Sequence, residues 1–492
     1  MSRRFIPPTI TDDSALGGNY DIERSILFLS QKYSYLYRDP PSAGNRRTFT
    51  ISVWFKPANN DENGLANSRI LSAGGSTGDS NYFSFSYLNN SGQLNLENGT
   101  GSLYTTAYFR DVTAWYHAVI AVDSTQSTAS DRFKLYINGQ RITDFASASY
   151  PTQNTDFSWN NDVPHSIGRE EYQFRRYFNG YIAQAIYAQG QSYAPTTFGS
   201  TNAQGTWVPI TTPSVTYGTN GFKLDFAGTG TSADASGFGA DTSGQANHFT
   251  SNNLHTNPST TDTPANNFAT LNVNDQWNSH TPQESVRGVL TKSGRNFSSN
   301  GPLGGSERYY NITGTIAVPS AGKWYWEAKP IAGSNGLGFR WTMGLFTLDR
   351  KYSTNSLREY DNSQGQVGTY TADGKVSANG SVVSTYETLA VNDIVSFKYD
   401  ADNRDLYIAK NGTYFNSGNA VLTSSNISDT GQKLVVLQNG SDGNVASQVN
   451  FGQPPYTIAS GNSDGNGYGN FEYAVPTGYY ALCTQNVAAY GG

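Results

Sequence analysis

The stretch that decides the fold class reads Arg132-Phe133-Lys134-Leu135-Tyr136-Ile137-Asn138-Gly139-Gln140-Arg141-Ile142. Polar and apolar side chains alternate strictly up to Ile137, which is typical of a strand with one buried face. Asn138 and Gly139 then supply the positive φ angles that a two-residue turn requires. The stretch therefore predicts a β-hairpin.

Similar short runs, separated by clusters of Gly, Asn, Ser and Asp, extend from about residue 25 to 200, as in a sandwich or barrel. In the run 48–55, alternate apolar residues share one face and Trp54 lies on the other, so both faces are expected to be covered. A second β-rich block begins near Leu290 and runs to about Asn486. It repeats the hairpin signal at Asn411-Gly412.

The composition of the 492 residues agrees with this pattern. Aromatic residues make up 13% of the chain, which is too many for a disordered protein. Good helix formers are scarce, whereas Gly (51 residues) and β-formers are abundant. We therefore expect an all-β protein.

Charge and hydropathy exclude several classes of partner. The net charge of −6 and the pI near 5.4 argue against a phosphate-binding surface, so we expect no nucleic acid partner. The first eight residues lack the apolar core of a signal peptide, and no window reaches about 18 apolar residues, so we expect no membrane insertion. The single cysteine, Cys483, excludes an internal disulfide and is expected to be buried.

The chain is divided by composition into four parts. Residues 1–24 are polar and without periodicity, and we interpret them as an N-terminal arm. Residues 25–223 and 287–492 form the two β-rich domains. Between them, residues 224–286 contain no Lys or Arg and are rich in Gly, Ser, Thr, Asn and Asp. This composition favours a long polar connector or a segment that lies along the surface, because little in it can form a core.

The first domain contains an ordered set of β-rich segments: Ser25-Ile26-Leu27-Phe28, Phe49-Thr50-Ile51-Ser52-Val53-Trp54-Phe55-Lys56, Ala114-Trp115-Tyr116-His117-Ala118-Val119, Lys134-Leu135-Tyr136-Ile137-Asn138-Gly139 and Phe178-Asn179-Gly180-Tyr181-Ile182-Ala183-Gln184-Ala185-Ile186-Tyr187. On these segments the domain resembles a concanavalin-like, laminin-G-type jelly roll. The resemblance covers about residues 25 to 200.

The second domain contains the segments Gly322-Lys323-Trp324-Tyr325-Trp326-Glu327, Asn392-Asp393-Ile394-Val395, Leu406-Tyr407-Ile408-Ala409-Lys410-Asn411-Gly412 and Val449-Asn450-Phe451-Gly452-Gln453-Pro454-Pro455. On these segments the domain resembles a SPRY domain, a related β-sandwich. Asn392 departs from the glycine that the family usually has there. Together the resemblances imply two jelly-roll or concanavalin-like β-sandwich domains joined by a connector.

The order of the two domains, with the intervening stretches 241–249 and 262–272, is similar to that of bacteriophage virion proteins. This resemblance implies a tail-fibre or other surface appendage on the virion, with host attachment through glycan binding. The alternatives are a capsid decoration or head-fibre protein without a role in adsorption, and a cellular lectin-like adhesin. The implied partners are other virion proteins through the arm, a host surface glycan or receptor, and further copies of the chain in a homo-oligomer, for which we expect a trimer.

No catalytic motif is present. HExxH, GxSxG, GxxxxGK[ST] and CxxC do not occur, and the five histidines are spread along the chain. His117 lies in an apolar run and is expected to pack rather than to act as a base. We expect a protein that is not an enzyme.

Sugar binding requires exposed aromatic rings beside polar groups, because a sugar ring has an apolar face and a rim of hydroxyls. Trp159, Tyr172 and Arg175 supply this mixture in a stretch that has the composition of a loop. Tyr352 and Tyr360 flank a polar loop in the second domain and are the weaker candidates. Trp54, Trp115, Trp324 and Trp326 occur in strand patterns and are expected in the cores.

Calcium is the one cofactor that the resemblance suggests, because laminin-G-like sandwiches hold it at a rim with carboxylates and carbonyls. Asp79, Asp123 and Asp131 lie in stretches expected to form loops, and hard cations prefer several oxygen ligands. The alternative is that these aspartates cap turns.

Overall fold

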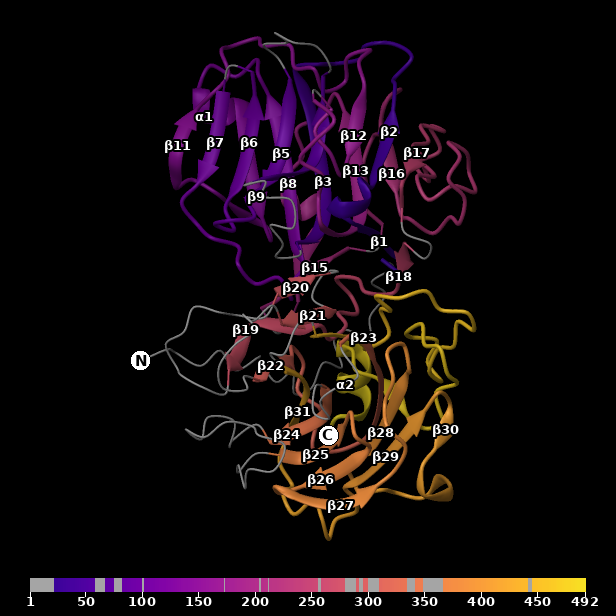
Figure 1. Ribbon diagram of the computed structural model, residues 1–492. Coiled ribbons are helices and arrows are strands. Elements are labelled where there is room, and N and C mark those ends of the chain that lie inside the picture. The colour runs from indigo at the N-terminus through magenta and orange to yellow at the C-terminus, as the bar shows by residue number, and fades with distance from the viewer. Residues whose placement is uncertain are drawn as a thin grey trace. The chain divides into compact units, whose positions relative to one another are not determined.

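The computed structural model describes residues 22–57, 67–74, 82–99, 101–171, 173–202, 205–210, 212–254, 258–278, 289–291, 295–299, 309–333, 341–347, 366–440 and 445–492. The chain divides into two units between Asn267 and Phe268. Each unit is a sandwich of largely antiparallel sheets, which confirms the all-β prediction (Figure 1). Among the described residues no helix is long and apolar enough to cross a membrane.

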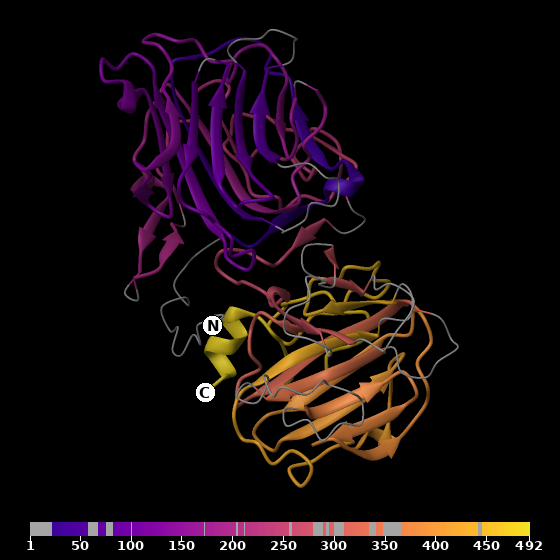
Figure 2. The ribbon, with the colours of Figure 1, turned by 60° about the vertical axis from the view of Figure 1, so that its left-hand side comes forward.

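Two sheets form the first unit, and Figures 1 and 2 show them from two directions. The first sheet has the order β10 (Gln140–Arg141), β9 (Phe133–Ile137), β8 (Tyr116–Asp123), β3 (Thr48–Pro57), β13 (Gly180–Gln189), β1 (Ser25–Phe28) and β18 (Ser259–Thr260), with β16 (Phe222–Leu224) also paired to β13. The second has the order β11 (Phe145–Ser149), β7 (Gly101–Thr105), β6 (Leu94–Asn98), β5 (Phe83–Tyr87), β4 (Ser68–Ala73), β12 (His165–Ile167), β2 (Tyr35–Arg38) and β17 (Thr250–Asn252).

Smaller elements complete the first unit. They are the 3₁₀ helices η1 (Ser30–Lys32) and η2 (Pro195–Thr197), the helix α1 (Ala129–Arg132) and the two-stranded sheet of β14 (Gly199–Thr201) and β15 (Trp207–Pro209).

The strand patterns of the first unit are confirmed. Phe49, Ile51, Val53 and Phe55 of β3 are buried in the core between the sheets. Asn138 and Gly139 join β9 to β10 with φ angles of 47° and 78°, so the expected hairpin is present. A Cβ atom at position 139 would also lie 2.5 Å from the Trp207 ring, so the position requires glycine for space as well as for conformation.

Residues 224–267, for which the composition left a connector and a surface-lying segment open, belong to the first unit. Short strands here extend both sheets: β17 pairs with β2, and β18 pairs with β1. Phe226 and Phe249 are buried in the core. Isolated aromatic residues therefore fix a segment whose average composition is that of a linker.

The second unit also has two principal sheets. One has the order β19 (Leu271–Asn278), β22 (Tyr309–Gly314), β31 (Lys433–Gly440), β24 (Trp341–Thr347), β25 (Gln366–Thr371), β26 (Lys375–Ala378) and β27 (Ser381–Thr385). The other has the order β20 (Val289–Thr291), β21 (Asn296–Ser299), β32 (Val445–Asn450), β23 (Lys323–Ala332), β28 (Val395–Asp400), β29 (Asp405–Lys410) and β30 (Thr413–Tyr414), with β33 (Tyr480–Ala481) parallel to β23.

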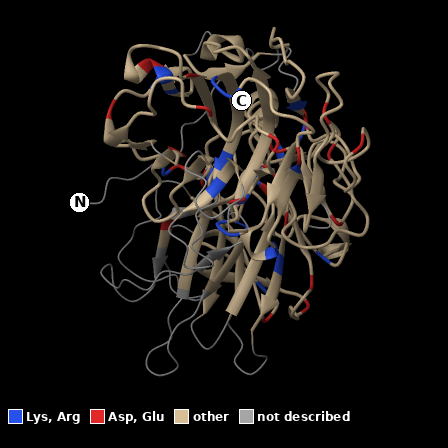
Figure 3. Cartoon of the chain, turned by 90° about the horizontal axis from the view of Figure 1, so that it is seen from above, with Lys and Arg blue, Asp and Glu red and all other residues tan. Residues whose placement is uncertain are grey.

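Trp324 and Trp326 of β23 are buried in the core of the second unit, as their shared face predicts. The hairpin at Asn411-Gly412 joins β29 to β30. The unit also contains η3 (Asn416–Gly418) and ends with the helix α2 (Thr484–Tyr490). The expected burial of Cys483 is confirmed just before α2. Figure 3 shows acidic and basic residues interspersed among many uncharged ones in the described part of the chain.

Candidate functional site

Aromatic and arginine side chains gather on the outer face of the second sheet of the first unit. Tyr35 and Tyr37 of β2 flank Leu36, which is buried in the core, so the two tyrosines project from the opposite, outer face. The segment 168–178 after β12 closes on itself, because the Phe178 amide donates to the Gly168 carbonyl at 2.8 Å. We call the following residues the tyrosine–arginine patch: Tyr33, Tyr35, Tyr37, Arg169, Phe174, Arg175 and Tyr177.

The rings of the patch are in contact. The Arg169 guanidinium lies 3.6 Å from the centre of the Tyr35 ring and 4.7 Å from that of Phe174. The Tyr177 ring lies 5.2 Å from Tyr33 and 6.2 Å from Tyr35. Cation–π and edge-to-face contacts of this kind hold the rings in defined positions.

Two rings of the patch are exposed to an unusual degree. Phe174 is 61% exposed and Tyr33 is 56% exposed. Their backbones, like that of Arg176, are left-handed, with φ angles of 52° at Phe174, 57° at Tyr33 and 54° at Arg176. This conformation costs about 1–3 kcal/mol at a residue other than glycine and is concentrated at functional sites. The chain therefore holds exposed aromatic rings on a strained backbone.

Carboxylates hold the arginines in place. Glu170 accepts ion-pair contacts from Arg69 at 3.2 Å, Arg175 at 3.0 Å and Arg176 at 2.9 Å. Arg69 is buried, whereas Arg175 is about half exposed and uses only its Nε toward Glu170 among the interactions of the described residues. Its two Nη groups are therefore available to donate to a ligand oxygen.

A second carboxylate fixes Arg169. Glu171 accepts from the Nη2 of Arg169 at 2.9 Å, and the Ser166 hydroxyl donates to the same carboxylate. Nearby, the Tyr37 hydroxyl donates to Asp39, and burial together with this contact raises the pKa of Tyr37 to about 12. The tyrosine thus stays protonated and neutral at physiological pH.

The sequence predictions for the glycan site meet this geometry in part. Arg175 lies in the patch, and Tyr172, Tyr352 and Tyr360 lie outside the described residues. The prediction for Trp159 is wrong, because its side chain is fully buried. Its ring packs in the core 5.4 Å from Phe83 and 5.9 Å from Tyr187. Polar neighbours place it in a loop, but the indole points inward.

Sequence reasoning missed the rest of the patch, namely Tyr33, Tyr35, Tyr37, Arg169, Phe174 and Tyr177. The alternation of tyrosines at positions 35 and 37 was a usable signal, because period 2 places them on one side of a strand, whereas Tyr33 lies in the left-handed turn before it. The buried residue between two of them, Leu36, confirms which side faces the core.

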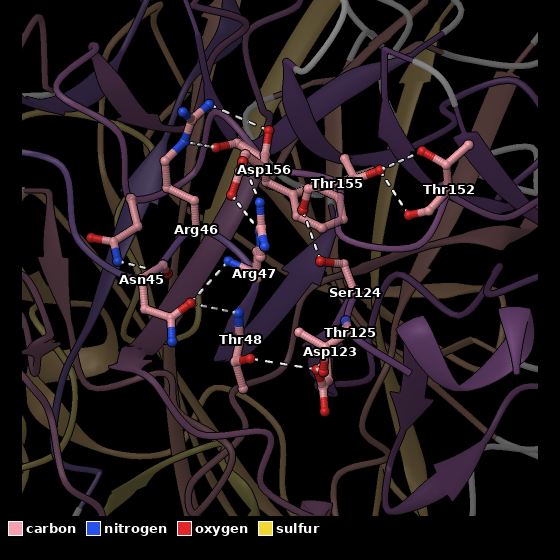
Figure 4. Close-up of polar contacts among 12 residues, drawn as sticks. Asn45, Arg46, Arg47, Thr48, Asp123, Ser124, Thr125, Thr152, Thr155 and Asp156 are labelled. Atoms are coloured by element: carbon pink, nitrogen blue, oxygen red, sulfur yellow. Dashed lines mark hydrogen bonds and ion pairs between the residues drawn. The ribbon is translucent and has the colours of Figure 1, made fainter. Parts of the chain in front are cut away.

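The described aspartates among those proposed for calcium, Asp123 and Asp131, serve as hydrogen-bond acceptors in this structure. Figure 4 shows Asp123 among its polar neighbours. Asp123 accepts from the Thr125 hydroxyl at 2.6 Å and from the Gln126 amide at 2.6 Å, and Thr48 lies 3.5 Å from the same carboxylate. Asp131 pairs with Arg141 at 3.1 Å, and Asp79 lies outside the described residues. In the described part of the chain, no three His, Cys, Asp or Glu side chains are grouped to hold a metal ion.

His117 and Ser52 lie together on the outer face of the first sheet. The direction of the hydrogen bond between them is the reverse of that in a nucleophile–base pair. The Nε2 of His117 is 2.7 Å from the Ser52 hydroxyl, and its Nδ1 accepts from the Trp207 indole at 2.9 Å. An indole N–H only donates, so in neutral His117 the proton is on Nε2 and points at Ser52. Burial also lowers the pKa of His117 to about 3. The prediction that His117 packs is confirmed, with its ring stacked 4.4 Å from Trp54.

Residues 30–189 match the family described as the concanavalin A-like lectin/glucanases superfamily. The match contains the patch and the strands on which it lies. It agrees with the laminin-G-type resemblance of the first domain.

Several solved structures are similar to this chain at low identity and low TM-score. The human HERC1 SPRY domain is 12% identical over 36% of this chain and 96% of its own, with a TM-score of 0.28. A SAP-like pentraxin from Limulus polyphemus is 17% identical over 35% of this chain and 79% of its own, with a TM-score of 0.27. Domains LG4-5 of the mouse laminin alpha1 chain are 8% identical over 88% of this chain and 86% of their own, with a TM-score of 0.26. No curated protein sequence matches this chain.

Proposed function

We propose that this protein binds carbohydrate through the tyrosine–arginine patch, as part of a surface appendage of a bacteriophage particle. The observation that carries the proposal is the exposure of Phe174 and Tyr33 beside Arg175, whose Nη groups have no partner among the described residues, on a domain that matches a lectin and glucanase family. The exposed rings offer their faces to the C–H side of a sugar, and Arg175 offers hydrogen-bond donors to its hydroxyls.

The role is binding without catalysis. The hydrogen bond between His117 and Ser52 supports this part of the proposal, because His117 donates to the hydroxyl in it. A base would have to accept the proton of the hydroxyl that it activates. Each exposed ring that stacks on a sugar contributes about 1 kcal/mol to the binding free energy, so a single site binds weakly. Several copies on one particle raise the overall affinity through avidity. We therefore propose a homo-oligomer, a trimer.

The place of the protein on the virion rests on the ordered sequence resemblance described above. In this proposal the arm, residues 1–24, contacts another virion protein, and the two sandwiches face the host surface. Mass spectrometry of purified particles tests it: the protein is expected as a stoichiometric component. A protein found only in the cell lysate or in the medium would contradict the virion proposal and leave the carbohydrate proposal standing.

Substitution of the exposed rings tests the carbohydrate proposal. A glycan array identifies a ligand for the intact protein, and titration calorimetry then compares variants on that ligand. F174A and Y33A are each expected to weaken Kd roughly fivefold, the equivalent of about 1 kcal/mol, with an unchanged melting temperature.

Tyr108 supplies the matched control, because it is 55% exposed and lies outside the patch. Y108A removes a similar exposed ring and is expected to leave Kd unchanged. Equal losses of affinity in Y108A and F174A would contradict the assignment of the site. So would an unchanged Kd in both F174A and Y33A. The absence of any glycan ligand would contradict carbohydrate binding itself.

A further inference from the structure

A buried lysine, aspartate and asparagine meet at the end of the first unit. Lys56 lies near the end of β3, and Asp262 and Asn267 come from the segment that follows β18. The Nζ of Lys56 contacts the Asp262 carboxylate and donates to the Oδ1 of Asn267 at 2.8 Å. Lys56 and Asp262 are almost fully buried.

The surroundings of this cluster are largely aromatic. The Lys56 Nζ lies 5.7 Å from the Trp115 ring centre and 5.1 Å from that of Tyr181. The Trp115 indole donates to Asp262 at 3.0 Å. Such surroundings penalise a separated charge pair and favour transfer of a proton from the ammonium to the carboxylate.

The Asn267 side chain is held in position for attack by Lys56. Its Nδ2 donates to the Thr113 carbonyl at 2.7 Å, which leaves Oδ1 toward Lys56. An amine fixed beside a carboxamide in this way gains the large effective concentration of an intramolecular reaction. A buried carboxyl group within reach of the amine is the proton carrier that amide exchange requires.

We infer that Lys56 and Asn267 form an intramolecular isopeptide bond with Asp262 as the general acid–base. A proton passes from the ammonium to Asp262, and the lone pair of Nζ then attacks Cγ of Asn267. The Nζ–Cγ bond forms and the Cγ–Nδ2 bond breaks. Asp262 relays both protons lost by Nζ to the departing nitrogen, which leaves as ammonium. Asp262 ends as the carboxylate it was at the start, and no oxidant or cofactor is consumed.

The bond would cross-link two parts of the chain 211 residues apart. Asn267 is the last residue of the first unit. The link therefore attaches the end of this unit covalently to β3. This inference is independent of carbohydrate binding, because none of its residues belongs to the patch.

Mass spectrometry of the full-length protein tests the inference. The intact mass is expected to be lower than the sequence mass by one ammonia. Trypsin does not cut between Lys56 and Pro57, and the chain has no Lys or Arg between 224 and 286. The digest is therefore expected to contain peptide 48–69 covalently joined to peptide 224–287. A wild-type protein of full sequence mass, with these two peptides recovered separately, overturns the inference.

Two variants assign the roles. N267A changes a partly exposed residue and is expected to fold, by its near-ultraviolet circular dichroism, and to show the full sequence mass. A link that persists in N267A would show that another carboxamide reacts and would overturn the assignment. D262N keeps the shape of the side chain but cannot carry the proton, so it is expected to remain unlinked. A D262N protein that links as the wild type does overturns the role of Asp262.

Discussion

Hydrogen-bond donors fix the protonation state of two buried histidines in the first unit. His117 accepts from the Trp207 indole at Nδ1, and His165 accepts from the Asn160 amide at Nε2, at 2.9 Å in each case. The other nitrogen of His165 donates to the Val163 carbonyl at 2.6 Å. A second proton on either imidazole ring would point at the N–H group that donates to that ring, and the hydrogen bond would be lost. Both rings are therefore structural, and burial lowers both pKa values to about 3.

Trp159 is also a structural residue, and this leads to a stability prediction. W159A removes a fully buried indole and is expected to lower the free energy of unfolding of the first unit by about 3–5 kcal/mol. Urea denaturation measures the loss.

W159F supplies the control for that substitution. Among the described residues the Trp159 indole N–H has no hydrogen-bond partner, so phenylalanine removes a buried donor while keeping an aromatic ring. W159F is expected to lose far less stability than W159A, and the folded fraction of both is expected to retain carbohydrate binding. Normal stability in W159A would contradict its place in the core.

At the scale of elements, the sequence pattern predicted the long strands and tight turns well and the short strands poorly. β3 and β9 have enough residues for alternation to be visible, and the Asn-Gly pairs have no common alternative to a turn. β16 and β17 have three residues each, which is too few to show a period. Their pairing is set by neighbours distant in sequence, which composition does not reveal.

The segment 258–267 shows the same limit. It is attached by the buried Lys56–Asp262 pair and by the Ser25 hydroxyl, which donates to the Asp262 carbonyl. Lys56 and Trp115, which contact the Asp262 carboxylate, lie more than 140 residues away in the sequence, so the role of this carboxylate follows from the fold. The patch depends in part on the same kind of information, because the pairing of β2 with β12 brings β2 next to the segment 168–178. The tyrosine alternation was visible in the sequence, whereas the arginine positions were not.

At the scale of the whole molecule, the two units are expected to respond differently to mild acid. The first contains His117 and His165, whose pKa values are about 3 in the folded state against an ordinary value of 6.5. The described residues of the second unit contain no histidine. A depressed folded pKa means that the unfolded chain binds the proton first, so this stability is present above pH 6.5 and is lost as the pH falls toward 3.

The loss has a predictable size. Each histidine contributes roughly 1.4 kcal/mol per pH unit once the pH is below 6.5, so the first unit is expected to lose about 3 kcal/mol between pH 7.5 and 5.5. Most carboxylates remain ionised over this range, which separates the histidine contribution from general acid denaturation. Hydrogen exchange followed by mass spectrometry, corrected for intrinsic rates, measures the two units in one sample. Protection is expected to fall roughly a hundredfold in the first unit and little in the second.

H117Q tests the cause of this difference. A glutamine amide accepts from Trp207 through its oxygen and donates to Ser52 through its nitrogen, so both hydrogen bonds of His117 have a counterpart, and the side chain does not titrate. The variant is expected to retain half of the pH-dependent loss, the part that belongs to His165. A loss as large as in the wild type would mean that groups other than His117 bind the proton on unfolding. Equal losses in the two units of the wild type would contradict the histidine explanation altogether.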